Sequence, residues 1–485
     1  MYLGLDLGTS SLKGLLIDQQ QRLVGSASAA LEIMRPAAGW SEQDPADWIA
    51  ACEKVLDQLV ANYPGQMSAL CAIGLSGQMH GATLVDEAGN PLRPSILWND
   101  TRSHKEAAEL DADPDFRAIS GNIVFPGFTA PKLVWVKRHE PEIFKKTKKI
   151  LLPKDYLRLW LTGEYICDMS DASGTSWLDV KKRDWSDILL EKTGLSRTNM
   201  PALVEGSAPG GMLRQKLAQR WGVGANVIVA GGAGDNAAAA IGMGVINSGM
   251  AFVSLGTSGV LFAATDKCRP APQTAVHSFC HALPARWHQM GVILAATDAL
   301  NWFSRIAGHN VQTLVDELGE NLKTPSGPLF LPYLGGERTP YNDAEVRGAF
   351  FGLSHNDDRA AMTRAVMEGV GFALRDNLQA LSAAGTEISR LLAVGGGAKS
   401  RYWLKTIASI LGLEVDVPRE GDFGAAFGAA RLGLMAASGL KPEQVCTPPE
   451  ISETIGPDKL LTAAFSERYE AYKAAYPRLC LLKGN

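Results

Sequence analysis

A short motif that occurs twice, far apart, limits how this chain can fold. The sequence DLGTS begins at Asp6, and SLGTS begins at Ser254, 248 positions later. At that offset residues 2–18 align with residues 250–266, and each copy has an apolar stretch, a Gly-Thr-Ser turn and a second apolar stretch that ends at an Asp. This order is typical of a strand, a tight turn and another strand. We therefore expect two half-chains built on one plan.

The length and the order of segments also favour two domains. A chain of 485 residues is too long for one hydrophobic core. Strand-like and helix-like segments alternate in both halves, which predicts layered α/β domains. The Ala- and Gly-rich segment 234–242 is echoed by 421–429, and such small residues allow two helices to approach closely where the halves meet. We expect an N-terminal domain of residues 1–246 and a C-terminal domain of residues 247–485, with residues 245–249 as a hinge.

Composition excludes several classes of function. A net charge of −4 offers no general attraction for nucleic acid or for an acidic membrane surface. The N-terminus does not resemble a signal peptide. Residues 236–265 lack charged side chains, but their longest apolar run has ten residues, and a membrane-spanning helix needs about 20. Seven scattered cysteines without a CxxC pair favour a reducing cytoplasm over a disulfide framework or a zinc cluster.

Three local patterns indicate ordinary structure. Asp44 followed by Pro45 predicts the start of a helix, because Asp can cap it and Pro suits its first turn. The Lys- and Arg-rich segment 137–149 predicts a solvated helical face. His277 and His281 flank Cys280 in an apolar stretch. We expect a core strand whose histidines bond to backbone, in preference to a metal site.

Three turns rich in Gly, Ser and Thr each follow an apolar strand. They lie at residues 8–11, 256–259 and 395–397. Turns of this kind present backbone N–H groups and hydroxyls without bulky side chains, which suits phosphate oxygens. The sequence contains neither a Gly-Lys pair nor GxGxxG, so a Walker A loop and the usual dinucleotide motif are excluded. A nucleotide would have to be held between the two hairpins.

The copies differ at one position, where Asp6 in the first corresponds to Ser254 in the second. A triphosphate with Mg²⁺ needs a carboxylate near the metal on one side and only neutral donors on the other. Asp6 could supply that carboxylate. The alternative is that Asp6 only bonds to its own turn.

Asp235 is the candidate general base. It follows the apolar strand at 227–234 directly, and ligands of layered α/β folds gather at the carboxyl ends of strands. A sugar hydroxyl is a weak acid, so a carboxylate in reach could accept its proton as the new bond forms. Asp422, at the corresponding place in the second half, illustrates the alternative that an Asp here only caps the next helix.

Candidates for binding a polar substrate have two interpretations each. His80 lies in a Gly-flanked turn after a strand, where it could be a ligand or a structural histidine. Trp98 could stack against a sugar, although an aromatic core position is the more common case. Asp168 and Asp171 could bind hydroxyls or only form a turn.

The chain contains the motifs DLGTSSLK, GFTAPKLVWVKRH, GGAGDNAAAAIG, SLGTSG, LPYLGGERTP and GGGAKS. On these motifs it resembles the FGGY family of carbohydrate kinases over nearly its whole length. The family shares the actin/hexokinase/Hsp70 ATPase fold, so the resemblance implies two duplicated, ribonuclease H-like α/β domains with a cleft between them. Ala233 and Ala361 depart from the family's usual residues, but neither carries a proposed catalytic side chain.

The resemblance assigns roles to individual residues of this chain. ATP would be bound by three groups: the first phosphate turn, the second phosphate turn, and a glycine pair against the adenosine. The sugar would lie beside the turn that follows the strand at residues 69–77, with Asp235 as the base. A Mg²⁺ ion would be held by Asp6 and Asp235 through water. The predicted residues are Thr9, Ser10 and Lys13, Gly256 and Thr257, and Gly396 and Gly397 for ATP, and Met79, His80, Trp98, Asp235 and Asn236 for the sugar.

Within the family, LSGQMHG, ILWNDTR, SDASGT and VHSFCHALP are most similar to bacterial members that act on D-xylulose. The resemblance therefore implies ATP-dependent phosphorylation of D-xylulose at its C5 hydroxyl, a step of xylose catabolism, in the cytoplasm. D-Xylulose and Mg-ATP would be its partners, with no nucleic acid and no membrane, and a homodimer is one alternative for its assembly. Kinases of ribulose, gluconate, glycerol or another polyol remain alternatives, as does an actin- or Hsp70-like ATPase switch.

Overall fold

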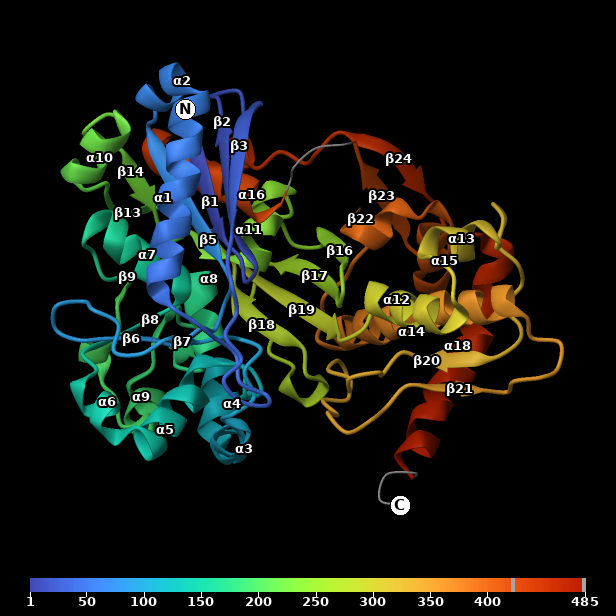
Figure 1. The fold of residues 1–485 in the computed structure, drawn as a ribbon. Helices are drawn as coiled ribbons and strands as arrows, with labels where there is room; N and C mark the ends of the chain where they lie inside the picture. Colours follow the sequence, from blue (N-terminus) through green and yellow to red (C-terminus); the bar gives the residue numbers. More distant parts are fainter. Residues whose placement is uncertain (420–423, 482–485) are drawn as a thin grey trace.

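The protein has two lobes, each built around a mixed β-sheet that is covered by helices (Figure 1). This computed structural model describes residues 1–419 and 424–481. Gly421, Asp422 and Phe423 of segment 421–429 therefore lie outside the described residues. The bounds of the strands in the first sheet are β1 Tyr2–Leu7, β2 Ser11–Ile17, β3 Leu23–Ala30, β5 Ala72–Gly77, β13 Pro209–Met212, β14 Ile228–Ala230 and β15 Ala233–Gly234.

The second sheet repeats the plan of the first, as the duplicated motif predicts. In the first lobe β1 pairs antiparallel with β2 and parallel with β5. In the second lobe β16 pairs antiparallel with β17 and parallel with β22. The predicted fold class, two duplicated α/β lobes, is confirmed. The strands of the second sheet are β16 Ala251–Leu255, β17 Gly259–Thr265, β18 His277–Cys280, β19 Trp287–Ile293, β22 Arg390–Val394, β23 Glu414–Pro418 and β24 Ile451–Ile455.

The two duplicated hairpins differ in the length of their turns. Leu7 pairs with Leu12 across the first turn, which leaves four residues between them. Leu255 pairs with Gly259 across the second, which leaves three. The ungapped alignment of the two copies therefore holds for the first strand of each hairpin and slips by one residue in the second strand.

Helices α11 (Asp235–Gly242) and α16 (Ala425–Ser438) cross in close contact between the lobes (Figure 1). A Cβ atom added at Gly428 of α16 would lie 1.7 Å from the carbonyl oxygen of Ala238. The same helix packs on the first sheet, where a Cβ at Gly74 would lie 1.7 Å from the Ala429 oxygen. This close approach, predicted from the small residues, requires glycine because any larger residue would overlap backbone atoms. Although α16 belongs to the second half of the sequence, it covers the first sheet.

The remaining elements surround the two sheets. In the first lobe these are α1 Pro45–Asn62, α2 Pro64–Ser68, α3 His104–Ala112, α4 Pro114–Ser120, α5 Thr129–His139, α6 Pro141–Lys146, α7 Pro153–Thr162, α8 Met169–Ala172, α9 Asp187–Thr193 and α10 Gln215–Trp221, with short strands β4 Glu42–Gln43, β6 Thr83–Val85, β7 Ser95–Ile96, β8 Lys149–Leu151, β9 Ile166–Asp168, β10 Leu178–Asp179, β11 Asp184–Trp185 and β12 Ala202–Val204. In the second lobe they are α12 Thr297–Ala307, α13 Val311–Asp316, α14 Arg359–Ala383, α15 Arg401–Leu411, α17 Pro442–Val445 and α18 Lys459–Cys480, with β20 Leu329–Leu331 and β21 Ala349–Phe351. Within residues 1–419 and 424–481, no helix has both the length and the apolar character needed to cross a membrane.

The local predictions are mostly confirmed. Helix α1 begins at Pro45, and the Asp44 side chain accepts a hydrogen bond from the Ala46 N–H. Segment 137–149 divides into the end of α5, the solvated helix α6 and the first residue of β8. His281 bonds to the Val245 carbonyl through Nε2, at 3.2 Å. The prediction is wrong for His277, whose Nδ1 has no partner among the described residues. Its ring packs against phenylalanines of both lobes.

Candidate active site

Two carboxylates lie at the same edge of the first sheet. Asp6 on β1 is in register with Ser76 on β5, and Ser76 is in register with Ala233 on β15. Asp235 follows β15 directly and is the first residue of α11. The Ser76 hydroxyl donates to the Asp6 carboxylate at 3.0 Å. The parallel strands therefore bring both predicted acidic residues to their carboxyl ends, where open α/β sheets bind ligands.

Asp235 is held by its neighbour in the chain. Its Oδ1 accepts hydrogen bonds from the Asn236 N–H at 2.7 Å and from the Asn236 side-chain amide at 2.9 Å. Burial raises the pKa of the Asp235 carboxyl, although these two bonds act in the opposite direction. The side chain is only partly exposed. Asn236, predicted to contact the sugar, thus uses one of its two amide N–H donors to orient Asp235.

A buried polar chain supports the segment before Asp235. The Gly234 N–H donates to the Ser170 hydroxyl at 3.1 Å, and that hydroxyl donates to Asp168 at 2.5 Å. Lys154 lies 2.6 Å from the other oxygen of Asp168 and 3.0 Å from Asp171. All three charged side chains are fully buried. Of the two interpretations of Asp168 and Asp171, the structural one is therefore correct, because no sugar hydroxyl can reach them.

The same chain explains a group of side chains that resembles a metal site. Ligand atoms of Asp155, Cys167 and Asp168 lie within 4.8 Å of one another. However, the Lys154 ammonium lies 2.6 Å from Asp155 and also 2.6 Å from Asp168, so it offsets part of the negative charge of this cluster. A fixed cation already occupies the position that a metal ion would need, so we assign the cluster a structural role.

Met79 and His80 form a turn directly after β5 that contacts the segment before Asp235. A Cβ atom at Gly234 would lie 2.8 Å from Met79 Cγ, so the Met79 side chain rests on that glycine. His80 adopts a left-handed backbone conformation, with φ of 69°. Its Nδ1 bonds to the Gly174 carbonyl at 2.8 Å, and because a carbonyl only accepts, Nδ1 carries the proton. Burial lowers the pKa of His80 to about 3. The ring is therefore neutral, with Nε2 as an acceptor for a hydroxyl.

The backbone of His80 is held as firmly as its ring. Its carbonyl accepts hydrogen bonds from the Thr129 hydroxyl and from Lys132 Nζ, both at 3.0 Å. Lys132 also donates to the Gly127 carbonyl at 2.7 Å and is fully buried, which lowers its pKa to about 7. A left-handed conformation costs a non-glycine residue free energy and persists where its surroundings over-determine it.

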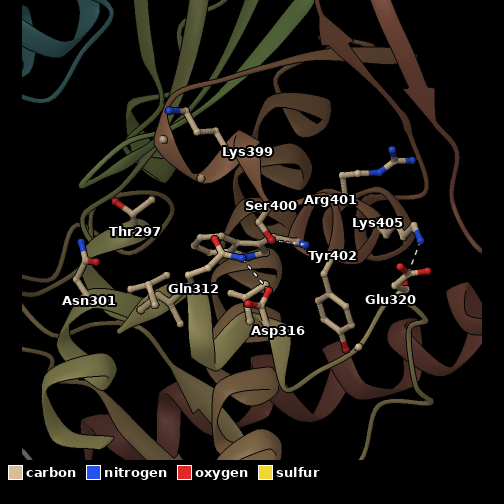
Figure 2. Close-up of a pocket in the computed structure, with 17 residues that line it drawn as sticks. Thr297, Asn301, Gln312, Asp316, Glu320, Lys399, Ser400, Arg401, Tyr402 and Lys405 are labelled. Carbon is tan, nitrogen blue, oxygen red and sulfur yellow. Dashed lines mark hydrogen bonds between the residues drawn. The ribbon is translucent and has the colours of Figure 1, made fainter. Parts of the chain in front are cut away.

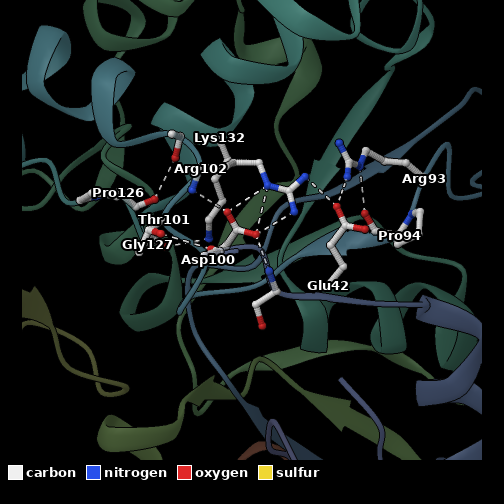
Figure 3. A network of polar contacts seen from close by, with 12 residues as sticks. Glu42, Arg93, Pro94, Asp100, Thr101, Arg102, Pro126, Gly127 and Lys132 are labelled. Carbon is white, nitrogen blue, oxygen red and sulfur yellow. Dashed lines mark hydrogen bonds and ion pairs between the residues drawn. The ribbon is translucent and has the colours of Figure 1, made fainter. Parts of the chain in front are cut away.

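Lys132 lies at one end of a buried network of charges (Figure 3). Within this network Arg102 pairs with Asp100 and with Glu42, both at 2.7 Å. Arg93 pairs with the same Glu42. The ion pairs join the segment between β7 and α3 to β4. Arg102 also lies over the ring of Trp135, 5.1 Å from its centroid, on the helix that carries Lys132.

The first phosphate turn is tied to the same lobe by glutamine side chains. The Thr9 hydroxyl donates to Gln78 at 3.2 Å, and its carbonyl accepts from Gln43 at 2.7 Å. The Trp98 indole N–H donates to the Thr9 hydroxyl at 2.9 Å. Trp98 is 46% exposed, so the expectation of a core position is wrong, and the ring lies beside the turn. Sequence reasoning missed Gln43 and Gln78, because only the folded structure brings them together.

Two further predicted residues of the first hairpin lie near that turn. Ser10 is exposed at its tip. Lys13 is in register with Asp6 across the hairpin. Directly opposite residues of paired strands project from the same face of a sheet. The hairpin therefore presents a carboxylate and an ammonium together beside the turn.

The second phosphate turn is fixed to the start of α12. The Gly256 carbonyl accepts hydrogen bonds from the Thr297 N–H at 2.9 Å and from the Thr297 hydroxyl at 2.7 Å. The Thr257 carbonyl accepts from the Ala296 N–H at 2.8 Å. A Cβ at Gly395, whose φ is 91°, would lie 2.7 Å from the Leu255 oxygen. The third glycine turn therefore packs against the second, as a shared nucleotide site requires.

A cavity of about 940 Å³ opens beside these two turns, between α12, α13 and α15 (Figure 2). Its size and half-open shape suit an adenosine. Gly396 and Gly397 line it, and Gly396 leaves open space where a side chain would stand. Sequence reasoning found these glycines but missed the rest of the lining. The missed polar residues include Asn301, Gln312, Asp316, Lys399, Ser400 and Tyr402.

The fold and the arrangement of turns, carboxylates and cavity are those of a sugar kinase. Residues 1–242 match the N-terminal domain of the FGGY family of carbohydrate kinases, and residues 251–437 match its C-terminal domain. The chain belongs to this family. Membership implies ATP as the phosphoryl donor.

Individual relatives cover the whole chain. The xylulose kinase of Escherichia coli K12 is 46% identical over 482 residues, which is 99% of each chain. A crystal structure of a "xyloylose kinase" from Brucella ovis is 63% identical, with a TM-score of 0.98, and covers 99% of this chain and 100% of its own. The structure of a Plasmodium falciparum glycerol kinase with ADP, 20% identical, shares the fold with a TM-score of 0.89 and covers 98% of this chain and 97% of its own.

Proposed function

We propose that this protein transfers the γ-phosphoryl group of ATP to the C5 hydroxyl of D-xylulose. The observation that carries the proposal is the carboxylate of Asp235, oriented by Asn236 beside the Met79–His80 turn. The 46% and 63% identical relatives named as xylulose kinases support D-xylulose as the acceptor. Full-length similarity supports the whole reaction and not only one domain.

In the proposed reaction the C5 oxygen forms a bond to the γ-phosphorus as the bond between that phosphorus and the bridging oxygen of ADP breaks. The hydroxyl proton passes to the Asp235 carboxylate. ADP leaves with the electron pair of the broken bond on the oxygen of its β-phosphate. Asp235 acts while the bond forms, because a sugar hydroxyl is too weak an acid to ionise beforehand. Because both bonds from Asn236 end on Oδ1, the other carboxylate oxygen, Oδ2, accepts the proton in this proposal.

The predicted phosphate residues divide between the lobes. In our proposal Thr9, Ser10 and Lys13 contact phosphate oxygens from the first lobe, and Gly256 and Thr257 contact them from the second. The fixed backbone of both turns means that their donors need no rearrangement when ATP binds. Adenosine occupies the cavity beside Gly396 and Gly397.

Asp6 and Asp235 fit a Mg²⁺ ion that is held through water. Mg²⁺ prefers hard oxygen donors and keeps several of its waters, and two carboxylates at the ends of the strands on either side of β5 supply such donors. When bound, the ion would neutralise charge on the β- and γ-phosphates. We further propose a cytoplasmic enzyme, and we keep the homodimer as an assembly to be tested.

The fold itself does not choose the acceptor, because a glycerol kinase and a gluconate kinase share it at 20% and 24% identity. A panel of D-xylulose, D-ribulose, D-gluconate and glycerol, assayed by ADP release, tests the proposal. D-Xylulose should have the highest kcat/KM by at least about 10-fold, since unpaired buried polar groups penalise wrong sugars. Another acceptor ahead by that margin would replace D-xylulose, and ATP hydrolysis unaffected by any sugar would contradict a kinase.

A further inference from the structure

Arg338 stands on a segment of the second lobe whose backbone is fixed. The Thr339 N–H donates to the Val292 carbonyl, and the Val292 N–H donates to the Thr339 hydroxyl, both at 3.1 Å. On the other side, the Glu337 carboxylate accepts from the Leu294 N–H at 3.0 Å. Both neighbours of Arg338 are therefore pinned to the end of β19, so the position from which its side chain extends is well defined.

The side chain crosses to the first lobe, where it meets the surroundings of His80. The Arg338 guanidinium lies over the ring of Phe125, 4.8 Å from its centroid. Phe125 packs edge-on against Phe128 at 5.4 Å, and Phe128 stacks on His80 at 4.5 Å. Arg338 thus reaches the predicted sugar site from the opposite lobe without any closure of the cleft.

The guanidinium has no acceptor from the protein. Across the described residues, no oxygen lies in hydrogen-bonding or ion-pairing geometry with it, and the guanidinium contacts the ring of Phe125. The adjacent carboxyl of Glu337 is turned to backbone N–H groups, and burial raises its pKa to about 8, so it is mostly neutral at pH 7. Arg338 is partly exposed, so water can reach its donors, and a polar ligand can replace that water without breaking a bond within the protein.

A sugar bound beside His80 would supply the missing acceptors. D-Xylulose must react in its open-chain form, since ring closure would consume the C5 hydroxyl. Its C2 carbonyl then offers an acceptor and no donor, which matches a side chain with donors only. In the proposed reaction the C5 end lies at Asp235, next to the segment that contacts Met79, and Arg338 is linked to His80 through Phe125 and Phe128.

We propose that Arg338 is a substrate-binding residue, which donates to the C2 ketone oxygen and its neighbouring hydroxyl at the end of the sugar remote from C5. This proposal rests on the proposed function and adds a contact from the second lobe to a site otherwise built by the first. It makes the keto end of the acceptor, and not only its hydroxyls, a recognised feature.

Isothermal titration of D-xylulose into the full-length protein tests the assignment. Arg338→Met keeps an unbranched side chain over Phe125 and removes every donor. The Kd for D-xylulose should rise at least about 10-fold, as expected when a hydrogen bond from a charged donor is lost. The Kd for ATP should stay within about 2-fold, because the adenosine cavity lies elsewhere. Arg347→Met is the matched control, since Arg347 is exposed and its guanidinium bonds to backbone carbonyls of its own segment.

The outcomes separate this proposal from the proposed function. A folded Arg338→Met variant that binds D-xylulose as tightly as wild type refutes the role of Arg338, and so does an equal loss of sugar and ATP affinity. If that variant does not fold, Arg338→Lys keeps the charge without the planar fork. Its Kd for D-xylulose should rise at least about 3-fold, and an unchanged Kd refutes the proposal. A wild-type protein that does not bind D-xylulose instead contradicts the acceptor, and the comparison is then made with the acceptor that the panel identifies.

Discussion

Replacing Asp235 with Asn removes the proposed base and little else. The Asp235 Oδ1 accepts both bonds from Asn236, and an Asn side chain can keep its oxygen at that place. The start of α11 should therefore be retained. Burial already disfavours the charged carboxylate, as its raised pKa shows, so a neutral amide should leave the melting temperature unchanged or slightly higher.

The loss of activity follows from the step that the carboxylate performs. Positioned general bases contribute about 10²- to 10⁴-fold, which corresponds to about 3–5 kcal/mol of the activation barrier. We expect kcat for D-xylulose to fall by that factor, with the Kd for ATP little changed. The assay is ADP release under saturating substrates, with a thermal melt for each variant. Asp422→Asn, at the corresponding place of the sequence repeat, should keep kcat near wild type.

The pH dependence gives a second check on the same residue. The base must be ionised to accept a proton, so kcat/KM should fall as the pH drops through the pKa of Asp235. Because burial raises that pKa, the acid limb should lie above the range of an ordinary Asp. The limb should be absent from the residual activity of Asp235→Asn. An Asn variant that keeps more than about a tenth of wild-type kcat would refute the assignment.

Four further perturbations test other parts of the structure. Asp6→Ala should lower kcat at least about 100-fold while calorimetry shows an unchanged Kd for D-xylulose; an equal loss of both would make Asp6 structural. Lys132→Met should raise the KM for D-xylulose about 10-fold with the KM for ATP unchanged, because it releases the His80 carbonyl; this effect should vanish in a His80→Ala background. Gly428→Ala should cost about 1–3 kcal/mol of stability in denaturant unfolding, whereas Gly65→Ala, with open space around it, should not. D-Xylulose with a nonhydrolysable nucleotide should reduce the radius of gyration in small-angle scattering, as hinge closure around ligands requires; an unchanged profile would count against closure.

Features encoded over a few consecutive residues could be predicted from the sequence. The helix start at Pro45 needs only a capping Asp and a proline. The repeated motif indicates the duplicated hairpins, and the apolar stretches on either side of each turn predict their paired strands. The position of Asp235 at the carboxyl end of a strand can be predicted from the apolar strand before it and the helix after it. In each case the determining interactions are local, so the pattern contains them.

Features that depend on distant segments could not be predicted. Gln43 meets Gln78 because β4 and the end of β5 converge, and nothing near either residue indicates this. The alternatives for Asp168 and Asp171 were decided by Lys154, which no local pattern pairs with them. Trp98 bonds to the first phosphate turn, 89 positions away, at a place that stays partly exposed. The other walls of the adenosine cavity come from helices whose polar faces look like any solvated surface.

The most direct test of the central claim identifies the product itself. The full-length protein is incubated with D-xylulose and ATP, and the sugar product is analysed by ³¹P and ¹³C NMR. The account predicts one ADP formed for each sugar consumed, and a phosphorus resonance that couples to the protons on C5. A phosphate on another carbon, or ADP formed without a phosphorylated sugar, would contradict it.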